Sequence, residues 1–181
     1  MKSTLITGGA RSGKSQFAQE LALKSGGGVL FVATAEAGDE EMKKRIEAHR
    51  KARPSTWQTL EVTTHVGRRI ALNIRQVQTV IIDCITLLIN NIFQRHDESV
   101  ESALIEEEVM AEINELVYCI EQSDARFIIV SNEVGLGLVP ADKVSRLYRD
   151  LLGKVNQVLA QHADQVYLMV AGVPVAIKTG D

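Results

Sequence analysis

The residues with the most specific chemistry form a phosphate-binding pattern near the start of the chain. They match G-x-x-x-x-G-K-[ST] at every position and are Gly8, Gly9, Ala10, Arg11, Ser12, Gly13, Lys14 and Ser15. The apolar pair Leu5 and Ile6 precedes them, and apolar residues recur at helical spacing from Phe17 to Ala22. In a strand, loop and helix of this kind, the loop amides converge on an anion at the positive end of the helix. The pattern therefore predicts a nucleoside triphosphate site rather than a chance glycine turn.

Three side chains have expected roles at that site. Lys14 would reach the β and γ phosphates, and the Ser15 hydroxyl would ligate Mg²⁺. Asp83 ends an apolar run over residues 79–83, at the place where a P-loop protein carries the acid that holds Mg²⁺. The alternative for Asp83 is a carboxylate that only caps the next turn. We expect Mg²⁺ as the cofactor, with Ser15 and Asp83 as its protein ligands.

A histidine supplies the second candidate chemistry. Met42, Ile46 and His49 share one face of a predicted helix over residues 39–51, which Asp39 would cap. The basic residues that surround this histidine are Arg50, Lys51 and Arg53. A neutral imidazole nitrogen attacks phosphorus readily, and nearby cations stabilise departing pyrophosphate and disfavour imidazolium. From spacing alone, a structural histidine at the edge of an apolar face remains the alternative.

Strand and helix patterns alternate along the chain and place these residues. Apolar runs, typical of strands buried on both faces, predict strands at 29–33, 79–83, 127–130 and 166–170, besides the one before the glycine-rich loop. Further strands are expected at 57–62 and at 173–178, the last forming a closing hairpin with 166–170. Helical spacing predicts helices at 39–51, 66–74, 100–122 and 142–162, besides the one after that loop. This order predicts an α/β fold of the P-loop NTPase type, with a mainly parallel sheet, helices on both faces and a C-terminal strand pair.

The composition limits the class of protein. The chain has 181 residues, 45% hydrophobic and 24% charged, as expected for one catalytic domain over residues 1–181. A net charge of −3 and the lack of a basic stripe argue against nucleic acid as a partner. No apolar run is long enough to span a membrane, and no signal peptide is evident. Cys84 and Cys119 lack metal or redox spacing, so we expect buried free thiols and a cytoplasmic protein.

Most of the chain resembles one known enzyme family. The matching stretches are Gly8 to Ser15, Ala33-Thr34-Ala35, Asp39-Glu40-Glu41-Met42, Arg45-Ile46-x-x-His49-x-x-x-Arg53-Pro54-x-x-Trp57, Glu61, Asp83-Cys84-Ile85-Thr86, Asn132-Glu133-Val134-Gly135-x-Gly137-x-Val139-Pro140, Arg149-Asp150-x-x-Gly153-x-x-Asn156-Gln157 and Gly172. They resemble the bifunctional adenosylcobinamide kinase / adenosylcobinamide-phosphate guanylyltransferase family of cobalamin biosynthesis. The histidine–arginine–proline stretch is more specific to this family than the glycine-rich loop is. Position 83 is Asp here where some relatives have Glu, which shortens the reach of the acid.

The resemblance implies two successive reactions. The hydroxyl of the aminopropanol arm of adenosylcobinamide would first attack the γ-phosphate of ATP or GTP. A histidine would then take GMP from GTP, release pyrophosphate and pass GMP to the new phosphate, giving adenosyl-GDP-cobinamide. By position, His49 matches the guanylylated histidine. The family is typically trimeric, so we expect a homo-oligomer whose contact lies near the 142–162 helix or the closing strand pair.

The resemblance also implies a wider nucleotide site. The residues that match segments around the nucleotide in this family are Thr34, Ala35, Glu36, Lys51, Ala52, Arg53, Pro54, Glu61 and Asp83. We infer that Glu61 accepts hydrogen bonds from guanine N1–H and N2–H₂, two donors that adenine lacks.

Two other functions fit parts of the sequence. One is a simple P-loop kinase of a small alcohol or nucleoside, in which His49 is structural. Such kinases usually carry an arginine-rich lid, and only the segment around 91–100 could serve as one, although it is short. The other is a nucleotide-switched assembly protein, which we expect to expose an apolar stripe; the sequence shows none beyond the core-facing helices. The acidic run Glu106-Glu107-Glu108 is more simply a solvated face than a metal cluster.

Overall fold

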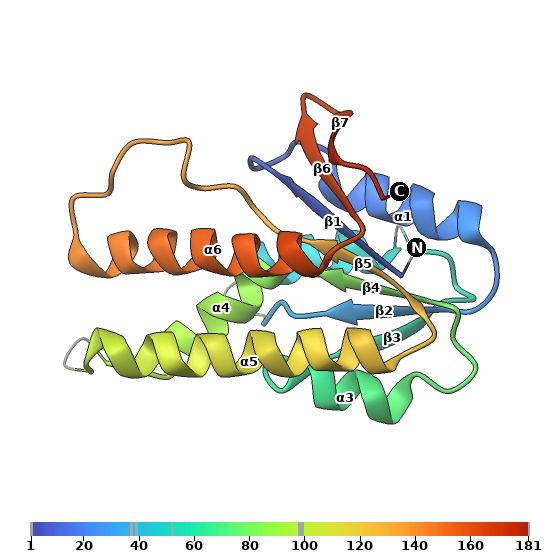
Figure 1. Ribbon diagram of the computed structural model, residues 1–181, viewed down its shortest axis with the longest axis horizontal. Helices are drawn as coiled ribbons and strands as arrows, with labels where there is room; N and C mark the ends of the chain where they lie inside the picture. Colours follow the sequence, from blue (N-terminus) through green and yellow to red (C-terminus); the bar gives the residue numbers. More distant parts are fainter. Residues whose placement is uncertain (1, 37, 39, 52, 98–99, 181) are drawn as a thin grey trace.

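The computed structural model describes residues 2–36, 38, 40–51, 53–97 and 100–180, and within them seven strands form one sheet. The sheet has the order β3-β2-β4-β5-β1-β6-β7, and its neighbours are parallel except for the antiparallel pair β6 and β7 (Figure 1). The strands are β1 (Ser3–Gly8), β2 (Val29–Ala33), β3 (Gln58–Glu61), β4 (Thr79–Asp83), β5 (Arg126–Val130), β6 (Gln165–Val170) and β7 (Val173–Lys178). This is the predicted α/β fold with its C-terminal strand pair.

Helices cover both faces of the sheet, because the central strands are apolar on both sides. Successive side chains of a strand point to opposite faces, so Leu5 packs into one core cluster and Ile6 into the other. The smaller cluster lies under α1 and the larger one under α3, α4, α5 and α6 (Figure 1). The helices are α1 (Lys14–Ser25), α2 (Glu40–Lys51), α3 (Val66–Asn73), α4 (Ile85–Phe93), α5 (Ser102–Gln122) and α6 (Lys143–His162).

The elements predicted from the sequence are present, with ends that differ by one or two residues at most. The helix α4 was not predicted from the sequence. Its last residues, 91–93, fall in the segment that was considered as a lid. This helix is buried almost all round: its Ile85, Leu88, Ile89 and Ile92 are apolar, and Asn91 is buried with them. The apolar residues of α4 continue almost directly from the apolar run of β4, so helical and strand patterns are hard to separate there.

The expectation that no apolar stripe is exposed is wrong. Leu136, Leu138 and Val139 are exposed in the segment between β5 and α6, and Val173, Val175 and Ile177 are exposed on β7. Neither group lies on a helix, so a search for helical stripes could not find them. The strand β7 is also the edge of the sheet, and all six of its residues are exposed.

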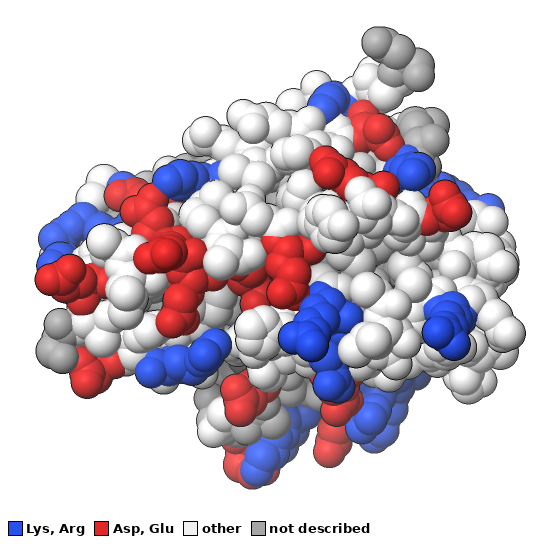
Figure 2. Space-filling model, turned by 60° about the horizontal axis from the view of Figure 1, so that its bottom comes forward, with Lys and Arg blue, Asp and Glu red and all other residues white. Residues whose placement is uncertain are grey.

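Charged side chains of both signs cover the face that carries α3 and α5, and acidic ones gather near its middle (Figure 2). In the run 106–108, only Glu107 is fully exposed: Glu106 pairs with Lys154 at 2.5 Å and Glu108 with His96 at 3.1 Å. Two of these three acids therefore bind neighbouring side chains. Both cysteines are free and buried, as predicted. Among the described helices, none is long and apolar enough to cross a membrane.

Candidate active site

The glycine-rich loop joins the carboxyl end of β1 to the first turn of α1. Gly13 precedes the helix with φ 93°, and Gly8 has φ 147°. A Cβ at Gly8 would lie 2.6 Å from the carbonyl oxygen of Met169, so glycine is required there by space as well as by dihedral angle. The strand, loop and helix predicted around the G-x-x-x-x-G-K-[ST] pattern are therefore present, and the loop ends at a helix N-terminus suited to an anion.

Lys14 is folded back over the loop. Its Nζ donates to the carbonyl oxygens of Gly8 at 3.0 Å and Gly9 at 2.6 Å, and the residue is only 7% exposed. Burial lowers the pKa of Lys14, while the nearby Cys84 and Asp83 oppose that shift. Burial raises the pKa of the Cys84 thiol to about 11, so Cys84 is neutral at pH 7 and Asp83 is the anion that acts on the ammonium. A triphosphate would replace the two carbonyl contacts of Lys14.

Ser12 carries an unsatisfied polar atom inside this loop. Its Oγ is buried and has no hydrogen-bond partner among the described residues. Its carbonyl oxygen accepts from the Gly172 amide at 3.1 Å, which ties the β6–β7 turn to the loop. Because buried hydroxyls nearly always have a partner, this hydroxyl is a donor that an anion bound in the loop could use. Ser15 lies half-buried in the first turn of α1.

Arg53 and Asp83 lie near each other, beside the glycine-rich loop. The Arg53 guanidinium carbon lies 3.6 Å from the centroid of the Phe31 ring on β2, a stacked cation–π contact. Burial lowers the pKa of Arg53, whereas the charges of Asp83 and Glu61 act in the opposite direction. The same Asp83 acts on Lys14, so one carboxylate at the end of β4 lies close to cations from both predicted segments. Pro54 is half-buried next to Arg53, and Lys51 is exposed at the end of α2.

A cavity of about 650 Å³ opens beyond the carboxyl ends of β2 and β3. It is lined by Ala33, Ala35, Glu36, Ile46, Arg50, Glu61, Val62, Thr63, Thr64, His65 and Arg69. Three predicted nucleotide residues, Ala35, Glu36 and Glu61, therefore share one cavity. Glu61 pairs there with Arg50 at 3.1 Å. Thr63, Thr64 and Arg69 were not predicted at the site, although their place just after a predicted strand was a usable signal.

Thr34 was also predicted to contact nucleotide, but its polar atoms bind protein. Its buried hydroxyl donates to the carbonyl oxygen of Cys84 at 2.7 Å and accepts from the Cys84 amide at 2.8 Å. Its own carbonyl oxygen accepts from Asn91 Nδ2 at 2.8 Å, and the same nitrogen donates to the carbonyl oxygen of Thr63 at 3.1 Å. Thr34 and Asn91 thus fix the relative positions of the segments that follow β2, β3 and β4.

A buried carboxylate binds the backbone of the segment around His65, which forms one wall of the cavity. Glu112 on α5 accepts from the amides of His65 and Val66, each at 2.7 Å, at the N-terminus of α3. The next turn of α5 contributes Glu115, which accepts from the Arg68 amide at 2.8 Å. These carboxylates satisfy amides that have no partner within the helix and add favourable charge at its positive end.

His49 belongs to α2, but its side chain lies outside the described residues, as do Asp39 and Ala52. Ile46 and Arg50, on either side of it in the same helix, line the cavity. Among the other histidines, His65 lines this cavity together with Arg69, and its Nδ1 lies 3.8 Å from Glu115 Oε2. His96 pairs with Glu108 at 3.1 Å and His162 with Glu121 at 3.0 Å.

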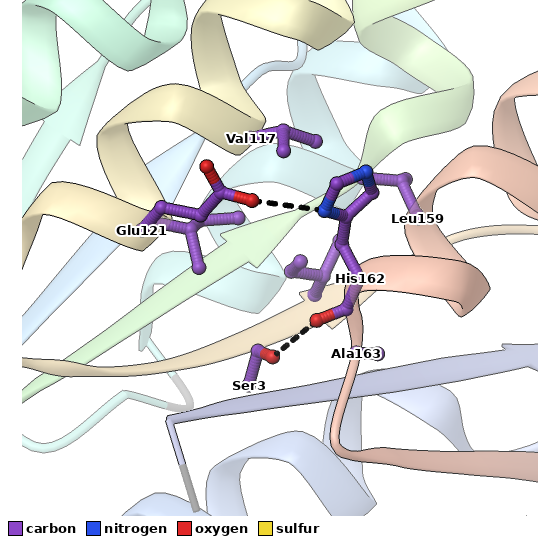
Figure 3. Close-up of a pocket in the computed structure, with 8 residues that line it drawn as sticks. Ser3, Val117, Glu121, Leu159, His162 and Ala163 are labelled. Atoms are coloured by element: carbon purple, nitrogen blue, oxygen red, sulfur yellow. Dashed lines mark hydrogen bonds and ion pairs between the residues drawn. The ribbon is translucent and has the colours of Figure 1, made fainter.

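His162 borders a second, much smaller void of about 20 Å³ (Figure 3). Ser3 and Ala163 also line it, so it lies where β1 begins, at the opposite edge of the sheet from the glycine-rich loop. Figure 3 shows Glu121 facing the His162 ring and Ser3 Oγ donating to the His162 carbonyl oxygen. A void of this size holds about one water molecule and no substrate.

Fold and loop together define an α/β protein of the P-loop NTPase type. The family model for cobinamide kinase / cobinamide phosphate guanyltransferase matches residues 4–177, and the chain belongs to this family of bifunctional enzymes. It is 37% identical over 179 residues to the bifunctional adenosylcobalamin biosynthesis protein CobU of Escherichia coli, covering 96% of this chain and 98% of the relative. It is 38% identical over 174 residues to the protein CobP of Pseudomonas aeruginosa, which has the same description, covering 96% of each chain.

Proposed function

We propose that this chain phosphorylates the aminopropanol hydroxyl of adenosylcobinamide with ATP or GTP, and then transfers GMP from GTP through guanylyl-His49 to give adenosyl-GDP-cobinamide. The observation that carries this proposal is that the glycine-rich loop and the 650 Å³ cavity lie at the same edge of the sheet, with Asp83 and Arg53 between them. One edge therefore offers a place for phosphates and a place for a nucleoside, as expected at the carboxyl ends of parallel strands. The description of the family names the same pair of activities.

In the kinase step, the substrate hydroxyl oxygen forms a bond to the γ-phosphorus, and the bond from that phosphorus to the bridging oxygen breaks. The nucleoside diphosphate leaves with the electron pair, and the hydroxyl proton is released. Lys14 neutralises charge on the β and γ phosphates, and the loop amides bind their oxygens. Ser15 and Asp83 have the oxygen donors that suit Mg²⁺, which when bound neutralises further phosphate charge.

In the transfer step, an imidazole nitrogen of His49 forms a bond to the α-phosphorus of GTP, and pyrophosphate leaves. A phosphate oxygen of adenosylcobinamide phosphate then attacks the phosphoramidate and releases the histidine. Arg50, Lys51 and Arg53 are the cations available to departing pyrophosphate. Because cations disfavour imidazolium, the same residues keep the nucleophile neutral.

Glu61 is the proposed acceptor for guanine N1–H and N2–H₂. Its present partner is Arg50, and both side chains of this ion pair are more than half exposed. Exposed ion pairs contribute about 0–1 kcal/mol, so exchanging this contact for a guanine costs little. Ala35 and Glu36 line the same cavity and complete the proposed nucleoside site.

We also propose a homo-oligomer, a trimer by resemblance, with the contact at the closing strand pair. Supporting it, β7 is an exposed sheet edge that carries Val173, Val175 and Ile177. Edge strands with apolar side chains tend to pair with another chain. A stable monomer by light scattering at micromolar concentration would contradict this part of the proposal.

Labelling with GTP tests the proposed function. The protein is incubated with GTP that is radiolabelled at the α or at the γ phosphorus, denatured and examined for label on the chain. We expect label from α-labelled GTP only, stable in alkali and lost in acid, because phosphoramidates behave in this way and serine esters do not. A protein that phosphorylates adenosylcobinamide but never takes up the α label is a simple kinase with a structural His49.

A further inference from the structure

The segment between β5 and α6 exposes three large apolar side chains. Leu136 is 85% exposed, Leu138 96% and Val139 66%. Residues 134–141, which we call the apolar loop, contain no ionisable side chain, in a chain of which 24% is charged. Apolar residues this exposed and this close together are unusual on a soluble surface, and they indicate a binding surface.

Hydrogen bonds hold the apolar loop at both ends. Before it, the Asn132 amide donates to Thr86 Oγ1 at 2.9 Å. After it, Arg146 Nη1 donates to the carbonyl oxygens of Pro140 at 3.0 Å and Ala141 at 2.6 Å. Asp142 caps α6 by accepting from the Ser145 amide at 2.7 Å. The apolar side chains therefore project from a segment that is anchored on both sides.

The apolar loop starts beside the glycine-rich loop. The amide of Glu133 donates to the carbonyl oxygen of Gly8 at 3.0 Å. Three residues of extended chain span at most roughly 10 Å, so the backbone of Leu136 lies within that distance of Glu133. Figure 1 shows this orange segment extending beyond the carboxyl ends of the strands, the side on which β1 leads into the glycine-rich loop. Leu136 thus lies near the proposed kinase site, and Leu138 and Val139 follow it in the same loop.

The substrate of the proposed function needs a surface of this kind. Cobinamide has a large corrin macrocycle with uncharged amide side chains, and its reacting hydroxyl is at the end of a flexible arm. The 650 Å³ cavity suits one drug-sized molecule, such as a nucleoside, and the other void is far smaller. The macrocycle must therefore dock outside both, close enough for its arm to reach the γ-phosphate.

We infer that the apolar loop is the docking surface for the corrin macrocycle, with Leu136, Leu138 and Val139 packing against the ring while the aminopropanol arm extends to the glycine-rich loop. This inference rests on the proposed function and assigns a place to its larger substrate. The loop offers apolar contacts to the methyl groups and hydrocarbon skeleton of the corrin ring, whereas the exposed strand β7 lies at the sheet edge, where a second copy of the chain could pair with it.

The test compares Leu136→Ser/Leu138→Ser with a control, Leu72→Ser/Leu104→Ser, which removes two other exposed leucines from α3 and α5. Steady-state kinase kinetics give KM for adenosylcobinamide and for GTP, and equilibrium dialysis gives corrinoid binding from its visible absorbance. We expect the loop variant to raise KM and Kd for the corrinoid about tenfold or more, since two apolar side chains lose their contacts. KM for GTP should stay within about twofold of wild type in the loop variant. In the control, KM and Kd for the corrinoid should also stay within about twofold of wild type.

A truncated substrate separates docking from chemistry. With an N-acylated 1-amino-2-propanol, which lacks the macrocycle, wild type and the loop variant should react at the same low rate. An unchanged corrinoid KM in the loop variant would overturn the docking surface while leaving the proposed function intact. A smaller mass by light scattering would instead make the loop a contact between copies, which also overturns it. Wild type that neither binds nor phosphorylates adenosylcobinamide would overturn the proposed function itself.

Discussion

Removing the charge of Glu112 should weaken the fold at the far wall of the cavity. The carboxylate is 7% exposed and accepts two backbone amides at 2.7 Å, from His65 and Val66. In Glu112→Gln, one oxygen still accepts, but the new NH₂ group faces the other amide and leaves it unpaired. A hydrogen bond to a charged group contributes about 1.5–3 kcal/mol, and the charge near a helix N-terminus about 0.3–1 kcal/mol. The neutral amide is cheaper to bury, so a net loss of about 2 kcal/mol is expected.

Urea unfolding at one fixed protein concentration measures this loss. The matched control is Glu107→Gln on the same helix, because Glu107 is exposed and should change the free energy of unfolding by less than about 0.5 kcal/mol. Glu112→Gln should also raise KM for GTP more than it lowers kcat. The residues that it displaces, around His65, line the cavity and not the glycine-rich loop. If Glu112→Gln is as stable as the control, the two amides do not depend on the carboxylate and this account of the cavity wall is wrong.

Other substitutions address the phosphate and strand-end contacts. Lys14→Ala should abolish both activities, a loss of several kcal/mol of transition-state stabilisation, and near-normal kinase turnover would show that the triphosphate binds elsewhere. Asp83→Asn should lower both rates, with partial rescue by excess Mg²⁺; rates independent of Mg²⁺ would count against its metal role. Thr34→Val should lose about 2–3 kcal/mol of unfolding free energy in urea, since it leaves the Cys84 amide unpaired. Thr34→Ser should keep most of that stability, and equal losses in the two variants would contradict the hydroxyl's role.

The sequence predicted most of the fold because its central strands are short apolar runs and its exposed helices carry one apolar stripe. The helix α4 escaped prediction because its apolar residues follow almost directly on the apolar run of β4, where strand and helix patterns are hard to separate. The role of Asn91 on this helix was therefore also not predicted. Its side-chain amide donates to the carbonyl oxygens of Thr34 and Thr63 and so connects segments far apart in the chain.

Local patterns also predicted the glycine-rich loop, in which neighbouring residues act together. The wall of the cavity was harder to predict, because Glu112 acts on His65 and Val66 from a distant helix. No spacing within one element encodes such a contact. Thr34 shows that position alone does not reveal what a side chain contacts. Its place at a strand end suggested nucleotide contact, and in the structure its hydroxyl binds the backbone of Cys84. Position predicts which edge a residue occupies, and only packing decides what its side chain contacts.

Covalent labelling of a His49 variant tests the central claim, that one chain performs phosphoryl and guanylyl transfer and uses His49 for the second. His49→Asn is incubated with α-labelled GTP and assayed in parallel for phosphorylation of adenosylcobinamide. We predict no label on the denatured chain, no adenosyl-GDP-cobinamide and most of the kinase activity, because γ-phosphoryl transfer depends on Lys14 and not on the imidazole. A variant that still takes up the α label would contradict the account, and His65, which lines the same cavity, would be the next residue to substitute.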